Sequence, residues 1–160
     1  MYLIFLLLIL ISLPANAMQK EVSLDYLVSR ADVIAVVDIV ATKNVGTLPS
    51  GTQVIANLVK INQPLKGCMA VGEKLKIKTK NIEDNPNFVK DERYLLFLIK
   101  EKNYYEIIAG FCGCWPLDNE GRILGYGTGK SIKDVEKAID SAINNVPVHK
   151  EESKAPAFTL

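Results

Sequence analysis

Glu92 to Lys100, with the sequence ERYLLFLIK, is the stretch that decides the fold. It holds five consecutive large apolar residues, Leu95 to Ile99. A short run that is apolar at every position is typical of a strand covered on both faces. After a tight turn at Glu101 to Asn103, the segment Tyr104 to Ala109 (YYEIIA) is predicted to return as its hairpin partner. This region therefore indicates a mainly β domain.

Further strands are predicted on either side of this hairpin. Asp32 to Thr42 (DVIAVVDIVAT) is dense in β-branched residues, and Thr52 to Ile61 (TQVIANLVKI) follows a loop rich in Gly, Asn and Pro. Glu73 to Lys80 (EKLKIKTK) alternates cleanly, which places its lysines on one face and its apolar side chains on the other. Arg122 to Tyr126 (RILGY) predicts a short last strand.

A helix is expected at each end of this β region. Ser23 can cap a short helix that runs to Ala31. Ser131 can begin a second helix, with Asp134 completing a capping box and apolar residues recurring at helical spacing to about Asn145. Short antiparallel strands with turn signals between them predict a small barrel of five to six strands, closed by the C-terminal helix.

Residues 1–17 predict a cleaved signal peptide. Tyr2 to Ile11 is an unbroken apolar run, and the small-x-small site Ala15-Asn16-Ala17 follows it. The run is shorter than the about 20 residues that cross a bilayer, so we expect no stable membrane span after cleavage. We therefore predict a secreted or periplasmic protein with one barrel domain over 18–146 and a mobile tail over 147–160.

The charge balance bears on the class of partner. Lys and Arg number 19 and Asp and Glu 18, which gives a net charge of +1. Nucleic acids and anionic membranes require a basic excess, so we expect no nucleic-acid partner. No string typical of a catalytic triad, a phosphate loop or a zinc protease occurs in the sequence. We therefore predict no enzymatic activity, no cofactor and no metal site.

Cys68, Cys112 and Cys114 are all candidates for disulfide bonding. In an oxidising compartment the default is a structural disulfide, here between Cys68 and one of the other two. Alternatively, Cys112 and Cys114 form a redox pair, because a Cys-x-Cys disulfide is strained and easily reduced. A third interpretation, a metal site with His149, lacks the four ligands that structural zinc requires. The pairing stays open at this point.

Two groups of residues are candidates for an interaction surface. The lysines of the strand Glu73 to Lys80 form either a solvated face that guards a sheet edge or a groove for an anion. The aromatic residues beside Cys-Gly-Cys form either an apolar patch or a plug at the end of the barrel. The candidate surface comprises Phe111, Trp115, Lys74, Lys76 and Lys78.

The order of the segments resembles that of a known group. The series is ADVIAVVDIVAT (31–42), VIANLVKINQPLKG (54–67), VGEKLKI (71–77) and FVKDERYLLFLIKEKNYYEIIAG (88–110). It resembles small exported bacterial proteins that are similar to the tissue inhibitors of metalloproteinases and the netrin module. The resemblance implies an OB-like Greek-key barrel, to which the short N-terminal helix and the C-terminal helix predicted above are added. The zinc-chelating N-terminal cysteine of those inhibitors has no counterpart near Met18, so their mechanism is not carried over.

The predicted function follows from these features. We expect an exported, non-enzymatic binding or interaction module on an OB-type barrel, with inhibition of a protease through its loops as one form of that role. Its partner would be another protein of the envelope or exterior. The alternative function is thiol–disulfide exchange through Cys112 and Cys114.

Overall fold

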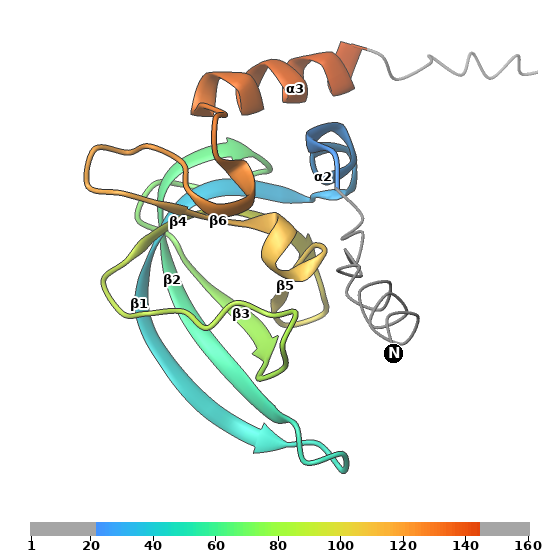
Figure 1. Ribbon diagram of the computed structural model, residues 1–160, viewed down its shortest axis with the longest axis vertical. Coiled ribbons are helices and arrows are strands. Elements are labelled where there is room, and N and C mark those ends of the chain that lie inside the picture. The colour runs from blue at the N-terminus through green and yellow to red at the C-terminus, as the bar shows by residue number, and fades with distance from the viewer. Residues whose placement is uncertain (1–21, 145–160) are drawn as a thin grey trace, which may run out of the picture.

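The computed structural model describes residues 22–144, so the predicted signal peptide and tail lie outside the described residues. The described chain is a six-stranded sheet with two α-helices and two short 3₁₀ turns (Figure 1). The strands are β1 (Val33–Thr47), β2 (Gln53–Lys66), β3 (Lys74–Lys80), β4 (Arg93–Lys100), β5 (Tyr105–Ile107) and β6 (Cys114–Leu117). The helical elements are α2 (Leu24–Arg30), η1 (Gly110–Gly113), η2 (Gly125–Gly127) and α3 (Ile132–Asn144).

Five of the strands close into a barrel. Their order is β1-β2-β3-β5-β4, and β4 pairs back with β1 over six residue pairs that run from Val33↔Leu98 to Asp38↔Arg93. All of these pairings are antiparallel except the parallel contact of β3 with β5. The extra strand, β6, pairs with the first half of β4, beyond the point where β5 ends. The predicted mainly β, OB-like barrel with a helix near each end is therefore confirmed.

Strand β4 is covered on both faces, as its unbroken apolar run predicts. Leu96 and Leu98 point into the barrel interior, where they pack with buried residues of β1, β2 and β3. Leu95 and Phe97 point outward and pack with α2, α3 and β6. Because side chains alternate along a strand, one strand supplies both apolar cores.

The two helices lie side by side on the outside of the barrel (Figure 1). Ser23 caps α2, because its hydroxyl accepts from the Tyr26 amide at 3.2 Å. Buried Val135 and Ile139 of α3 pack in the outer core. The barrel is closed by the β1–β4 pairing, whereas α3 covers its outer face, so the prediction that this helix closes the barrel is wrong. No helix among residues 22–144 has the length and apolar character to cross a membrane.

Two strand predictions differ from the structure. The predicted strand over Arg122–Tyr126 is reduced to one isolated bridge, Leu117↔Ile123, and the chain then turns through η2. Strand β6, by contrast, was not predicted. It contains Pro116, which lacks an amide hydrogen and is tolerated on a strand at the edge of a sheet.

Candidate functional site

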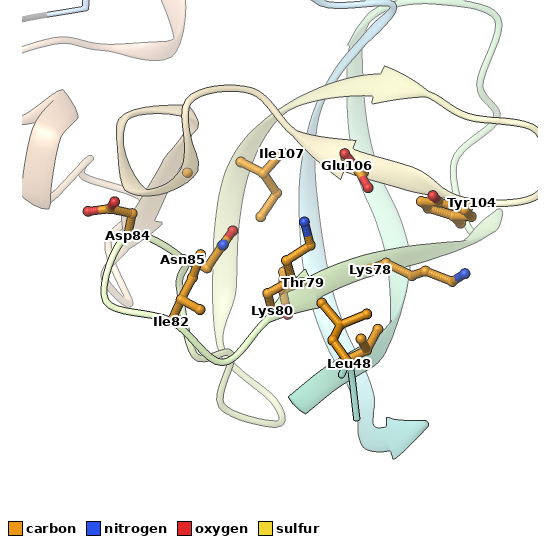
Figure 2. A pocket seen from close by; sticks show the side chains of 12 residues that line it. Leu48, Lys78, Thr79, Lys80, Ile82, Asp84, Asn85, Tyr104, Glu106 and Ile107 are labelled. Carbon is orange, nitrogen blue, oxygen red and sulfur yellow. The ribbon is translucent and has the colours of Figure 1, made fainter. Parts of the chain in front are cut away.

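A cavity of about 440 Å³ lies where β3 and β5 separate, and we call it the β3–β5 groove (Figure 2). Its walls come from the tip of the β1–β2 hairpin, the end of β3, the loop that follows β3, and β5 with the start of η1. The apolar lining residues are Leu48, Val54, Ile82 and Ile107, and the charged ones are Lys78, Lys80, Asp84 and Glu106.

The groove exists because the ladder between β3 and β5 is short. These strands share one residue pair, Ile77↔Tyr105, whereas β3 pairs with β2 along its whole length. The amide of Asn81 donates to the carbonyl of Gln53 at 2.9 Å. In an antiparallel ladder, residues whose backbone groups bond to the partner strand alternate with residues whose backbone groups point away from it. Because Asn81 bonds to β2, the backbone groups of Lys78 and Lys80 point away from β2 and toward the groove. The Lys78 amide belongs to the Ile77↔Tyr105 pair and the Lys80 carbonyl accepts from the Ile82 amide at 2.9 Å. The Lys78 carbonyl and the Lys80 amide are left without a partner strand in the described chain, and they form the open edge of β3.

Charged side chains of both signs line the groove. The Lys78 Nζ lies 3.9 Å from the centroid of the Tyr104 ring, a cation–π contact at the rim. Figure 2 shows Lys80 extending from β3 toward Glu106 and Ile107 on the opposite wall. Desolvation, together with the carboxylates of Glu106 and Glu101, raises the pKa of the Tyr104 hydroxyl.

No side chain in the described part of the chain forms an ion pair with these charged groups. Within residues 22–144, the ion pairs are those of Arg93 with Asp38 and of Arg122 with Asp118 and Glu120. The four charged groups of the groove thus remain available to a ligand.

Backbone packing fixes one wall of the groove. The amide of Phe111 donates to the carbonyl of Asp84 at 3.2 Å, which ties the loop after β3 to η1. Gly110 has a φ of 55°, and a Cβ at that position would overlap the same carbonyl oxygen. Glycine therefore permits the close approach that holds Asp84 at the groove.

The structure separates the residues of the predicted interaction surface. Lys78 lines the groove, whereas Lys74 and Lys76 lie on the exposed face of β3 outside it. Phe111 is exposed on η1 and does not line the groove. The alternation predicted for β3 is confirmed, since Leu75, Ile77 and Thr79 are buried.

Trp115 belongs to the core, so its assignment to an interaction surface is wrong. Only 2% of its surface is exposed. Its ring packs edge-on against Phe97 at 4.9 Å between centroids, and its Nε1 donates to the carbonyl of Cys112 at 2.7 Å. The cause is the β4–β6 pairing, which turns Trp115 into the outer core between the barrel and the helices.

The three cysteines are free thiols in this structure, so the predicted disulfide is not formed. Cys114 points into the barrel interior, whereas Cys68 is exposed in the turn after β2. Burial raises the pKa of Cys114 to about 12, and desolvation together with the Asp84 charge raises the pKa of Cys112. Exchange requires a thiolate, so this environment argues against the thiol–disulfide alternative.

A metal interpretation gains no support from the described part of the chain. Within residues 22–144, no three His, Cys, Asp or Glu side chains gather as they would around a metal ion. His149 lies outside the described residues.

Sequence reasoning missed most of the groove. Leu48 and Ile82 carry the one signal that could have revealed it, because each is an exposed large apolar residue in an otherwise polar turn. Tyr104 and Glu106 gave no such signal, because their role depends on where the β3–β5 ladder ends. A scan against models of protein families finds no match to this chain, and neither does a search of the curated proteins.

Proposed function

We propose that this protein is an exported, non-enzymatic binding module that holds an extended segment of another envelope or extracellular protein in the β3–β5 groove. The observation that carries the proposal is the open edge of β3 inside a groove that also offers apolar and charged side chains. A bound segment would lie along this edge as an added strand.

The backbone of β3 supports this mode of binding. Strand addition takes its affinity from main-chain hydrogen bonds and its specificity from pockets for alternate side chains. The carbonyl of Lys78 and the amide of Lys80 face the groove beyond the Ile77↔Tyr105 pair, which ends the existing ladder. An added strand would continue the sheet from that point.

The side chains around the edge of β3 favour a ligand that carries both acidic and apolar side chains. Lys78 and Lys80 favour carboxylates in the bound segment, while Leu48, Ile82 and Ile107 favour apolar side chains beside them. The volume of about 440 Å³ falls within the usual range for ligand sites. An extended segment in which acidic and apolar residues alternate satisfies both requirements.

Two sequence features support the choice of an exported partner. The signal-peptide pattern of residues 1–17 supports a ligand outside the cytosol. The resemblance to the tissue inhibitors and the netrin module adds a precedent for a protein as the ligand.

A peptide selection tests the proposal. The full chain is used to select from a displayed library of random linear peptides, and the affinity of the selected peptides is then measured in solution. We expect acidic–apolar peptides that bind the wild type and lose affinity for the Lys78→Glu/Lys80→Glu variant. The matched control is Lys74→Glu/Lys76→Glu, which makes the same charge change on the same strand outside the groove. Equal losses in the two variants would contradict the proposal.

A second pair of variants tests the backbone contribution. Lys80→Pro removes an amide that faces the groove, whereas Lys80→Ala removes only the side chain. We expect the proline variant to bind the selected peptides more weakly than the alanine variant, with circular dichroism to show that both are folded. Equal binding by the two would exclude strand addition at this edge.

A further inference from the structure

Two polar side chains lie inside the barrel among apolar ones. Asn57 on β2 is 1% exposed and Thr79 on β3 is 5% exposed, and the Asn57 Nδ2 donates to the Thr79 Oγ1 at 3.0 Å. The other buried side chains of residues 22–144 are apolar apart from the Cys114 thiol, the Tyr94 hydroxyl and the Trp115 indole N–H, and the last two donate hydrogen bonds. Burial of polar groups is unfavourable unless they are hydrogen-bonded, so this pair calls for a compensating interaction.

The hydrogen bonding of the pair is incomplete. The Asn57 Oδ1 is fully buried and has no hydrogen-bond partner among the described residues. A 180° rotation of the amide would exchange its two ends and again leave one polar atom without a partner. An unsatisfied buried polar group is unfavourable.

The pair opens onto a second cavity, which we call the barrel-mouth cavity. Its volume is about 350 Å³, and it lies between the inner faces of β1, β2 and β3 and the loop that leads to β4. Its polar lining consists of three amides and two hydroxyls, and its largest apolar residue is an aromatic ring. These residues are Asn57, Asn81, Asn87, Thr42, Thr79 and Phe88. None of the residues that line it carries a charge.

We infer that the barrel-mouth cavity binds an uncharged, polyhydroxylated ligand the size of one sugar ring. Amide and hydroxyl side chains both donate and accept hydrogen bonds, as do the hydroxyls of a sugar. Phe88, held edge-on against Tyr94 at 5.0 Å between centroids, presents apolar surface to the carbon face of the ring.

This site is distinct from the β3–β5 groove and does not depend on the proposed function. Thr79 lines both cavities, but the four charged residues line only the groove. An uncharged lining selects against ionised ligands, because their charge would lose its hydration without gaining a partner.

Nuclear magnetic resonance titration of the full chain tests the inference. The probes are glucose, N-acetylglucosamine and glucuronate, the last of which keeps the ring of glucose and adds a carboxylate. We expect the two neutral sugars to shift the side-chain amide signals of Asn57 and Asn87 at millimolar concentration and glucuronate to shift them less. Equal shifts by glucuronate, or no shift by either neutral sugar, would overturn the inference.

Two asparagines of one loop provide matched variants. Asn87 lines the barrel-mouth cavity, and Asn85 lines only the groove. We expect Asn87→Ala to weaken sugar binding about tenfold and Asn85→Ala to leave it within about twofold. Neither side chain belongs to the buried core, so we expect both variants to fold. Equal effects of the two variants would also overturn the inference. So would a structure of crystals grown with the sugars in which only ordered water lies beside Asn57.

Discussion

Gly127 lies so close to the indole of Trp115 that a side chain has no room there. A Cβ would overlap atoms of Trp115 and Ile123 in the outer core. We expect Gly127→Ala to lower the free energy of unfolding by about 1–3 kcal/mol, because overpacking displaces core side chains. Chemical denaturation followed by the fluorescence of Trp115, the single tryptophan, measures this change. Gly46→Ala is the control, since a Cβ there meets nothing within 4 Å, and its effect should stay within about 0.5 kcal/mol.

The thiols should differ in reactivity according to their burial. With a pKa of about 12, about 10⁻⁴ of Cys114 is thiolate at pH 8, and the thiol is also inaccessible. We therefore expect iodoacetamide to modify exposed Cys68 in the native protein and Cys114 only after unfolding, as read by peptide mass spectrometry. Cys68→Ser should abolish the rapid labelling. Rapid native labelling of Cys114 would show that its environment in solution differs from the buried one described here.

The ion pair between β1 and β4 predicts a pH dependence. Partial burial raises the pKa of Asp38, but the hydrogen bond from Arg93 and the positive charges of Arg93 and Lys60 outweigh it and hold the pKa below its ordinary value of 3.8. A carboxyl whose pKa is lowered in the folded state stabilises the fold above pH 3.8. That contribution disappears as the pH falls through the pKa of Asp38 in the folded protein. Both side chains are partly exposed, so we expect Asp38→Asn to cost at most about 1 kcal/mol at pH 7.

Urea titrations at a series of pH values measure this dependence. The stabilities of wild type and Asp38→Asn should converge as the pH drops below 3.8. Asp140→Asn, on the exposed face of α3, is the control and should change the stability at pH 7 by less than Asp38→Asn does. A difference between wild type and Asp38→Asn that persists unchanged at low pH would contradict the role of the Asp38 charge.

At the scale of elements, the capping box of α3 is confirmed in atomic detail. The amide and hydroxyl of Ser131 both donate to the Asp134 carboxylate at 2.7 Å, and the Asp134 amide donates back to the Ser131 hydroxyl at 3.3 Å. We expect Ser131→Ala to lower the free energy of unfolding by about 1 kcal/mol. Ser141→Ala, in the same helix but away from its cap, should be neutral or slightly stabilising. If both variants behave alike in thermal unfolding, the cap does not stabilise α3.

Elements whose signal is local could be predicted from the sequence, and elements that depend on a distant partner could not. The alternation of β3 and the apolar run of β4 are visible within single segments, and both strands occur where expected. Strand β6 has no alternation of its own and exists because Cys114–Leu117 pairs with the first half of β4. The β3–β5 groove was missed for the same reason, since it reflects how early the pairing of two strands ends.

At the scale of the whole molecule, β4 supplies side chains to both cores, and we expect the two cores to unfold as one cooperative unit. Leu96 lies in the interior core, and its neighbour Phe97 packs against Trp115 in the outer core. Loss of packing around Leu96 should therefore destabilise both cores together. We expect Leu96→Ala to lower the free energy of unfolding by about 2–5 kcal/mol, and Leu124→Ala, at an exposed position, by far less.

Two probes distinguish one cooperative unit from two. Trp115 fluorescence follows the outer core, and circular dichroism follows the sheet as a whole. In Leu96→Ala both transitions should move to lower denaturant by the same amount, because a two-state protein shows coincident transitions by different probes. If the fluorescence transition stayed in place while the circular dichroism transition moved, the outer core would unfold independently, and the shared strand would not couple the barrel to its two helices.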